Sequence, residues 1–180
     1  MKLSVALCTY NGEKFLREQL DSILKQTLKI DEIVICDDKS TDNTIEIINE
    51  YVEKFPSIFH LYINEITLKS VKNFEKALNH CTGEIVFLSD QDDVWKINKV
   101  EEYVAYFNLN KTIKAIASNG YCIDENSEVI EKYSLWDIPY FLKEQNTNID
   151  YFKTITYFSN IATGASMALK KELLSEIIPF

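Results

Sequence analysis

The chain has 180 residues, of which 46% are hydrophobic, and its formal net charge at pH 7 is -9. This length and composition predict one well-packed domain over residues 1–180 and leave too little chain for two domains of ordinary size. The acidic balance argues against binding to nucleic acid, which needs a local excess of lysine and arginine. Since no apolar run approaches about 18 residues, we expect no membrane span, and the first residues do not read as a secretion signal.

Cysteine usage indicates the compartment. The four cysteines show no CxxC spacing, and three of them lie in or beside apolar runs. They resemble small buried hydrophobic residues more than disulfides or zinc ligands, so we expect a reducing environment and a cytoplasmic protein. They are Cys8, Cys36, Cys81 and Cys122.

Strand and helix patterns alternate through the first part of the chain. Apolar segments typical of strands occur at residues 3–8, 33–36, 59–63 and 85–88. Apolar residues at helical spacing follow each of them, at residues 16–24, 45–55, 71–78 and 100–107. The second helix is expected to stop before Pro56 and to be capped by Thr41 or Asp42. Three strands are continuously apolar rather than alternating, which predicts an α/β fold with a largely parallel sheet covered on both faces.

Beyond residue 110 the pattern becomes less regular. A fifth strand is expected at residues 113–118, and the polar residues 124–127 predict a turn that joins the short apolar segments on either side. Residues 139–148 are interpreted as an irregular excursion. Residues 165–169 predict another strand, and a short helix is expected to begin at Lys171.

Three carboxylates stand together directly after the fourth predicted strand, in the sequence Ser-Asp-Gln-Asp-Asp at residues 89–93. Carboxylates repel by about 1 kcal/mol at 4 Å even in water, so such a group is stable mainly around a cation. Mg²⁺ or Mn²⁺ suits the site, because these ions take one or two carboxylates and complete their coordination with water and phosphate oxygens. The alternative is that Asp92 or Asp93 merely caps a helix that begins near Trp95, although a cap needs only one carboxylate.

Two further polar motifs follow predicted strands. Thr9, Tyr10 and Asn11 leave the first strand, and Asp37 and Asp38 leave the second. Ligands of open parallel sheets bind beyond the carboxyl ends of the strands, so we expect both motifs to lie near the acidic cluster. An aromatic ring for a base, acceptors for base N–H groups or ribose hydroxyls, and a cation for a diphosphate are the parts of a nucleotide site.

Several segments together resemble family 2 glycosyltransferases of the GT-A fold, through their order and spacing. They are residues 9–12, 19–27, 34–42 and 88–96. The match covers roughly the first 120 residues. The resemblance implies a Rossmann-like three-layer α/β/α sandwich with a mostly parallel sheet. In it, residues 1–120 would form the nucleotide-binding part, and residues 121–180 would form an incomplete acceptor-side part.

The same resemblance implies an enzyme, an inverting glycosyltransferase that uses Mg²⁺ or Mn²⁺. Its partners would be a nucleoside-diphosphate sugar donor and a saccharide or lipid-linked acceptor in cell-surface polysaccharide synthesis. The variant Ser-Asp-Gln-Asp-Asp-Val-Trp at residues 89–95 is similar to bacterial members that build rhamnose-containing polysaccharides. This implies dTDP-rhamnose, or a UDP-sugar, as the donor.

Carried over residue by residue, the resemblance gives roles on the nucleotide. Tyr10 matches the aromatic residue that lies against the pyrimidine, and Asp38 matches the carboxylate that accepts from the base N3–H. The neighbouring nucleotide-binding candidates are Thr9, Asn11 and Asp37.

On the diphosphate side, Asp92 matches the direct metal ligand of the family's Asp-x-Asp pair. Asp90 matches its partner, which contacts the ribose or the metal, in the latter case through water. Asp93 is expected to be adjacent support or a helix cap. Lys72 and Asn73 are candidates for facing the diphosphate, with exposed first-turn positions as the alternative.

The family's catalytic base lies in an acidic motif downstream of a strand that residues 163–168 resemble. The sequence ends at Phe180 before such a motif, so we expect the base to lie beyond it, together with any segment for peripheral association with the inner face of the membrane. Glu172 and Glu176 have spacing that favours the solvated face of a short helix. Residues 1–180 alone are therefore expected to bind donor and turn over poorly or not at all.

Two alternatives remain. A nucleotidyltransferase that forms sugar nucleotides has a related sheet and uses metal-binding aspartates. It would need a glycine-rich phosphate loop after the first strand, and the chain has only 4 glycines in all. The other alternative is a donor-binding fragment without turnover.

Overall fold

The computed structural model describes residues 1–148, 150, 153–154 and 162–180, without the side chains of residues 131–133. It contains two compact units. Unit 1 comprises Met1–Ile116 and Ala168–Phe180, and unit 2 comprises Ala117–Met167. The three polar motifs after the predicted strands all lie in unit 1.

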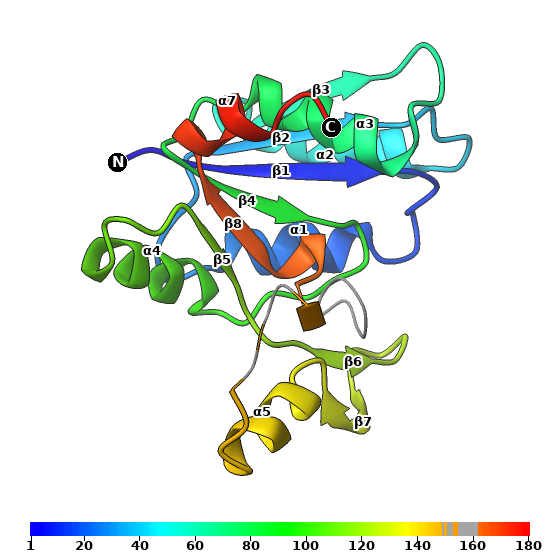
Figure 1. Cartoon of the computed structure of the whole chain (residues 1–180). Helices are drawn as coiled ribbons and strands as arrows, with labels where there is room; N and C mark the ends of the chain where they lie inside the picture. Colours follow the sequence, from blue (N-terminus) through cyan, green and yellow to red (C-terminus); the bar gives the residue numbers. More distant parts are fainter. Residues whose placement is uncertain (149, 151–152, 155–161) are drawn as a thin grey trace. The chain divides into compact units, whose positions relative to one another are not determined.

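The main sheet has the strand order β3-β2-β1-β4-β8-β5 (Figure 1). Its strands are β1 (Leu3–Thr9), β2 (Glu32–Asp37), β3 (Phe59–Ile63), β4 (Ile85–Ser89), β5 (Ala115–Ala117) and β8 (Met167–Lys170). Strands β3, β2, β1 and β4 run parallel, and β8 runs antiparallel to β4. The prediction of a largely parallel sheet is thus confirmed, with an antiparallel strand added beside β4.

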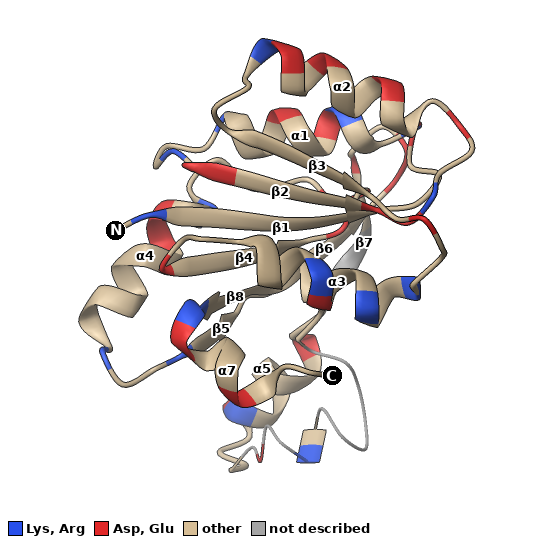
Figure 2. Cartoon of the chain, turned by 90° about the horizontal axis from the view of Figure 1, so that it is seen from above, with Lys and Arg blue, Asp and Glu red and all other residues tan. Residues whose placement is uncertain are grey.

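Helices connect the parallel strands and cover the sheet. They are α1 (Leu16–Leu24), α2 (Thr44–Lys54), α3 (Lys69–His80), α4 (Lys99–Leu109) and α7 (Leu174–Ile177). The apolar faces of α1, α2 and α4 share one hydrophobic core with the sheet. Figure 2 shows α1 and α2 on one side of the sheet and α3 and α7 on the other. This is the predicted three-layer arrangement.

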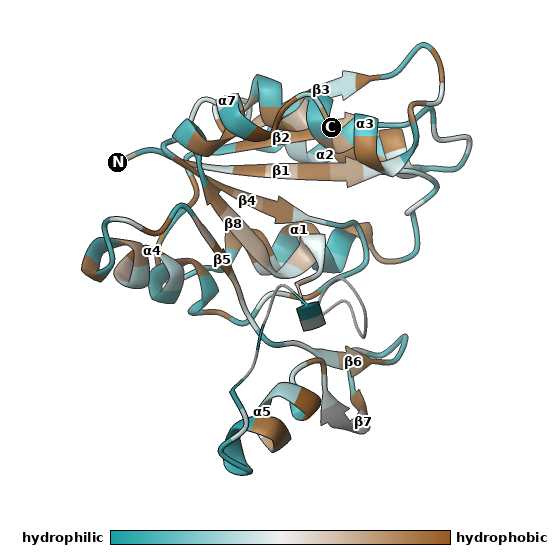
Figure 3. Cartoon of the chain, viewed as in Figure 1, coloured by the Kyte–Doolittle hydropathy of each residue, from teal (hydrophilic) through white to brown (hydrophobic). Residues whose placement is uncertain are grey.

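Every residue of β1 and of β2 is buried. Within β1, Val5 and Leu7 point into the core formed with α1, α2 and α4, while α3 contacts β1 and β2. A strand with both faces covered needs apolar residues at successive positions, which explains the continuous runs in the sequence. Figure 3 shows these hydrophobic residues gathered in the central strands.

Unit 2 contains β6 (Tyr121–Ile123) and β7 (Val129–Ser134), which pair antiparallel as the predicted hairpin. The expectation of an irregular excursion at residues 139–148 is wrong, because α5 spans Asp137–Glu144. Pro139 lies in the first turn of α5, where a missing N–H removes no helical hydrogen bond. The segment at residues 165–169 begins as a 3₁₀ turn, and β8 starts only at Met167.

Candidate functional site

The loops after β1, β2 and β4 leave the same edge of the main sheet. The parallel register pairs Thr9 with Asp37, and Leu7 with Ser89, so the three strands end side by side. This arrangement brings the Tyr10 loop between the Asp38 loop and the acidic cluster, as the strand-end argument predicts.

Tyr10 is 53% exposed, and its backbone is held by a side chain from the acidic loop. The Tyr10 N–H donates to Gln91 Oε1 at 2.8 Å, and Gln91 Nε2 donates to the Tyr10 carbonyl oxygen at 3.0 Å. The ring therefore stands on a fixed backbone while keeping an accessible face for a planar ligand. No role was assigned to Gln91 from the sequence, and this contact was missed.

Asn11 ties the β1 loop to the β2 loop. Its backbone has φ 48°, a left-handed conformation that asparagine tolerates better than most residues. The Asn11 N–H donates to Ser40 Oγ at 2.9 Å, and Asn11 Oδ1 accepts from the Thr41 N–H at 2.8 Å. These contacts give Asn11 a structural role, and its predicted contact with a nucleotide stays a prediction.

Asp37 is fully buried and holds the start of its own loop. Its carboxylate accepts from Thr9 Oγ1 at 2.8 Å, from Ser40 Oγ at 2.6 Å and from the Ser40 N–H at 2.8 Å. Both carboxylate oxygens are thus engaged within the protein, as is the Thr9 hydroxyl. The contacts that Thr9 and Asp37 make tie the β1 and β2 loops together.

Asp38 joins the β2 loop to the beginning of α3. Its carboxylate accepts from Asn64 Nδ2 at 2.8 Å, from the Leu68 N–H at 2.7 Å and from the Lys69 N–H at 2.9 Å. Burial raises the pKa of this carboxyl, but the three donors outweigh burial and hold the pKa below its usual value. Asp38 is therefore an ionised acceptor. Its contact with a base stays a prediction.

The carboxyls of the acidic cluster, Asp90, Asp92 and Asp93, lie close enough to act on one another's charge. Burial and then the charges of Asp93 and Asp92 raise the pKa of Asp90 to about 6. Burial and the charge of Asp92 also raise the pKa of Asp93, whose Oδ2 is buried without a hydrogen-bond partner among the described residues. Asp92 is exposed. These features are typical of carboxylates that bind a cation.

The cap interpretation of Asp92 and Asp93 is wrong, because the helix after the cluster does not begin near Trp95. Helix α4 begins at Lys99, and Asn98 is its N-cap residue. The segment between the cluster and α4 is held by α1 instead. Ser22 Oγ accepts from the Trp95 N–H at 3.1 Å.

Buried polar residues at the end of α1 and just after it, within residues 19–27, fix this segment. Gln26 is fully buried, its Nε2 donates to the Lys96 carbonyl oxygen at 2.9 Å, and its Oε1 accepts from the Val100 N–H at 3.0 Å. Sequence reasoning quoted this stretch without assigning it a role. A glutamine just after an apolar helical segment is the signal that could have indicated one.

The carboxylates of the acidic cluster fit a hard divalent cation that is held partly by the protein and partly by a bound diphosphate. In the described part of the chain, no three His, Cys, Asp or Glu side chains converge into a preformed metal site. Mg²⁺ and Mn²⁺ do not require one, since one or two carboxylates suffice when a diphosphate supplies further oxygens. The unpartnered oxygen of Asp93 and the repulsion within the cluster fit such an ion.

A lysine not singled out from the sequence lies beside the cluster. Lys99 Nζ stands 4.1 Å from the centroid of the Trp95 ring. Burial lowers the pKa of Lys99 to about 8, and the charge of Asp93 partly offsets this effect. The sequence places Lys99 at a helix start, and only the fold brings it to Asp93.

Lys72 and Asn73 lie on α3. Lys72 Nζ donates to Glu75 Oε2 and to the Phe180 carbonyl oxygen, both at 3.0 Å. Asn73 is buried rather than exposed, so the first-turn alternative fails for it. Its Nδ2 donates to the Cys36 carbonyl oxygen at 2.8 Å, and its Oδ1 accepts from Asn64 Nδ2 at 2.8 Å. The predicted approach of both residues to a diphosphate stays a prediction.

Glu172 and Glu176 are both exposed, as the solvated-face interpretation predicts, and Glu176 pairs with Lys114. Cys8, Cys36 and Cys81 are buried as expected, whereas Cys122 is exposed.

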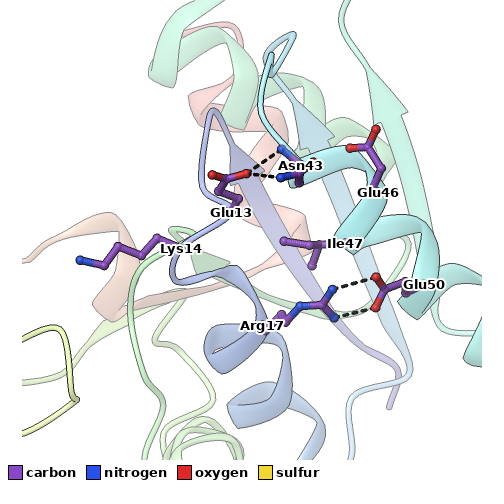
Figure 4. A pocket seen from close by; sticks show the side chains of 7 residues that line it. All are labelled: Glu13, Lys14, Arg17, Asn43, Glu46, Ile47 and Glu50. Atoms are coloured by element: carbon purple, nitrogen blue, oxygen red, sulfur yellow. Dashed lines mark hydrogen bonds and ion pairs between the residues drawn. The ribbon is translucent and has the colours of Figure 1, made fainter.

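A separate groove lies between α1 and α2 (Figure 4). Its lining residues are Glu13, Lys14, Arg17, Asn43, Glu46, Ile47 and Glu50. Arg17 closes one end of it with two hydrogen bonds to Glu50, of 2.6 and 2.7 Å. The lining contains none of the predicted site residues.

Among the described helices, none combines the length and apolar character that crossing a bilayer requires.

Comparisons with known proteins show which chains this one is similar to. The chain is 32% identical over 180 residues to the dTDP-rhamnosyl transferase RfbG of Shigella flexneri. This match covers 97% of this chain and 57% of RfbG. It is 31% identical over 127 residues to the UDP-Glc:alpha-D-GlcNAc-diphosphoundecaprenol beta-1,3-glucosyltransferase WfgD of Escherichia coli, covering 71% of this chain and 49% of WfgD. The chain thus spans about half the length of these curated relatives.

The fold is that of GT-A glycosyltransferases. The mannosyltransferase PcManGT of Pyrobaculum calidifontis, solved in complex with GDP-Man and Mn²⁺, matches with a TM-score of 0.74 at 24% identity. The match covers 99% of this chain and 47% of PcManGT. The protein-family model described as Glycosyl transferase family 2 matches residues 4–177. The chain therefore belongs to glycosyltransferase family 2.

Proposed function

We propose that this chain is the donor-binding part of an inverting, metal-dependent glycosyltransferase. One observation carries the proposal: a single sheet edge gathers an exposed aromatic ring, an ionised carboxylate and a cluster of repelling aspartates, on Tyr10, Asp38 and Asp90–Asp93. Along the edge the order is Asp38, Tyr10 and the acidic cluster, so the first two groups suit the base and the cluster suits the diphosphate of a nucleotide sugar.

Asp92, with Asp90 beside it, would hold Mn²⁺ or Mg²⁺ together with the donor diphosphate. The exposure of Asp92 and the raised pKa of Asp90 support this assignment, because an incoming cation would offset both the burial and the repulsion that raise this pKa. When bound, the ion neutralises charge that develops on the leaving diphosphate. The complex of PcManGT with GDP-Man and Mn²⁺ supports the choice of a divalent ion.

The rest of the donor would be held by groups of this chain. Tyr10 would stack against the base, and Asp38 would accept from its N–H, with Thr9, Asn11 and Asp37 keeping the two loops in place. In an inverting transfer, a carboxylate base takes the proton of an acceptor hydroxyl, whose oxygen attacks the anomeric carbon as the nucleoside diphosphate departs. We assign that base to none of the described residues, and the nucleotidyltransferase alternative gains no support from the family match.

The name of RfbG supports dTDP-rhamnose as the donor, and the name of WfgD supports a UDP-sugar and a lipid-linked acceptor. A saccharide acceptor or a lipid-linked acceptor would suit the proposed role in cell-surface polysaccharide synthesis. The free thiols of Cys8, Cys36, Cys81 and Cys122 support the proposed cytoplasmic location, at the inner face of the membrane where a lipid-linked acceptor would lie.

Calorimetric titration tests the proposal. We expect dTDP or UDP to bind with a dissociation constant between about 1 µM and 1 mM in the presence of Mn²⁺ or Mg²⁺, and more weakly after chelation. Asp92→Ala should abolish the metal-dependent part. Glu53→Ala, which removes an exposed carboxylate near the end of α2, is the matched control and should bind as the wild type does.

Equal binding with and without metal, or by Asp92→Ala, would remove Asp92 from its role. A preference for GDP over both pyrimidine nucleotides would contradict the assignment of Tyr10 and Asp38 to a pyrimidine.

A further inference from the structure

We propose that Gln91 is a positioning residue for the donor nucleotide: its side-chain amide fixes the loop that carries Tyr10 against the loop that carries Asp90 and Asp92. This inference rests on the proposed function and adds a residue to it. The two hydrogen bonds between Gln91 and the Tyr10 backbone are called the Gln91 bridge below.

The Gln91 bridge uses both ends of one amide on one residue. Gln91 Oε1 accepts from the Tyr10 N–H at 2.8 Å and Gln91 Nε2 donates to the Tyr10 carbonyl oxygen at 3.0 Å, although the residues lie 81 positions apart. Strands β1 and β4 are joined by backbone hydrogen bonds only as far as their ends. Beyond that point, the Gln91 amide takes over this role and joins the two loops. Movement of either loop would break both bonds.

Gly12 provides the space that the bridge needs. A Cβ built on Gly12 would lie 2.5 Å from Gln91 Cδ and 3.1 Å from Gln91 Cγ, too close for any real contact in the first case. The obstructed atoms belong to the end of a flexible side chain. A methyl group at residue 12 would therefore displace the Gln91 amide from Tyr10 while leaving the backbone in place.

The bridge matters because one ligand must touch both loops at once. In the proposed complex the base contacts Tyr10, and the diphosphate contacts the ion held by Asp90 and Asp92. Loops held at the right separation before binding do not have to be ordered by the ligand, which raises affinity. A ligand that touches only the acidic loop gains nothing from the bridge.

The test compares two ligands on four variants by calorimetry with Mg²⁺ present. Gln91→Ala removes the bridge, Gly12→Ala displaces it, and the double variant does both. Gln145→Ala, at the exposed C-cap of α5, is the control. The ligands are dTDP or UDP, which spans both loops, and inorganic diphosphate, which can reach only the acidic loop.

Gln91→Ala and Gly12→Ala should each weaken nucleoside diphosphate binding about tenfold, as expected for two neutral hydrogen bonds. Inorganic diphosphate should change by less than about twofold, since it does not use the Tyr10 loop. The double variant should be no weaker than Gln91→Ala alone, because both changes remove the same bridge. Hydrogen exchange at the Tyr10 amide should accelerate in all three and stay unchanged in Gln145→Ala.

Unchanged nucleotide binding in Gln91→Ala would overturn the inference, and so would an equal loss for both ligands, which would indicate damage to the acidic loop or the fold. Additive losses in the double variant would contradict the shared origin. If the wild type binds no nucleoside diphosphate, the proposed function fails and the positioning role with it. Tyr10 exchange distinguishes this outcome, since it reports on the bridge without any ligand.

Discussion

Glu32, at the first position of β2, is a buried carboxylate that the fold fully satisfies. Its oxygens accept from Ser4 Oγ at 2.5 Å, from the Thr82 N–H at 2.7 Å and from Thr82 Oγ1 at 2.8 Å, and Lys2 Nζ lies at 3.3 Å. Burial raises the pKa of Glu32, but these donors outweigh it and lower the pKa from 4.5 to about 2. The contrast with Asp90 is instructive, because hydrogen-bond donors lower the pKa of Glu32, whereas burial and neighbouring carboxylates raise that of Asp90.

The Glu32 network should make stability depend on pH. A carboxyl whose pKa is lower in the folded state stabilises it fully above pH 4.5, and this contribution is lost as the pH falls toward 2. At pH 7 we expect Glu32→Gln to lower the free energy of unfolding by about 3 kcal/mol. Urea unfolding at pH 7 and pH 3 measures this, with the exposed Glu53→Gln as the control. A gap between wild type and Glu32→Gln that does not narrow at pH 3 would contradict the prediction.

At the scale of elements, the turn from α3 into β4 depends on close backbone approach. A Cβ on Gly83 would lie 2.5 Å from Ser4 Oγ, 2.7 Å from the Ser4 nitrogen and 2.9 Å from the Lys2 carbonyl oxygen. Two of these atoms belong to the backbone of β1 and its approach, so they cannot rotate away. In addition, the Gly83 N–H donates to Ser4 Oγ at 2.8 Å.

We therefore expect Gly83→Ala to lower the free energy of unfolding by about 1 to 3 kcal/mol through overpacking. Gly120→Ala is the matched control, because a Cβ there would lie 3.3 Å from Leu135 Cδ1, on a side chain that can move. Denaturant unfolding of both variants decides the point. Equal stability of the two would show that the β1 backbone yields more easily than its position in the sheet suggests.

Apolar periodicity was sufficient to predict the strands and helices of unit 1, but less so their ends. Strand β2 extends to Glu32 and Asp37, polar residues that periodicity places outside, because each is buried within its own hydrogen-bond network. Residues 139–148 were interpreted as irregular, whereas α5 begins at Asp137 and contains Pro139 in its first turn, where a proline removes no helical hydrogen bond.

At the scale of the whole molecule, some residues of the candidate site could likewise be predicted from the sequence and others could not. Tyr10 and the acidic cluster could be predicted, because each follows a strand and carries its chemistry in its own sequence. Gln91 and Gln26 could not, since their partners lie 81 and 74 residues away and only the fold brings them together. Contacts that hold a site in place depend on long-range pairing, which a single sequence does not reveal.

The two units should also differ in how readily their backbone opens. Strand β1 is paired on both sides and buried throughout, whereas β6 pairs only with β7 in the described part of the chain. A two-stranded hairpin is marginal by itself, so amides of β6 should exchange with solvent faster than those of β1. Hydrogen exchange followed by mass spectrometry measures both. Equal protection would contradict the expectation.

Asp38 combines two tasks in one carboxylate, since the group proposed to select the base also anchors the amides of Leu68 and Lys69 at the entrance to α3. A replacement that alters nucleotide choice at this position must also supply new acceptors about 30 residues downstream. Divergence of base preference in such a scaffold is therefore expected to proceed through compensated pairs of changes, one at residue 38 and one in the stretch leading into α3.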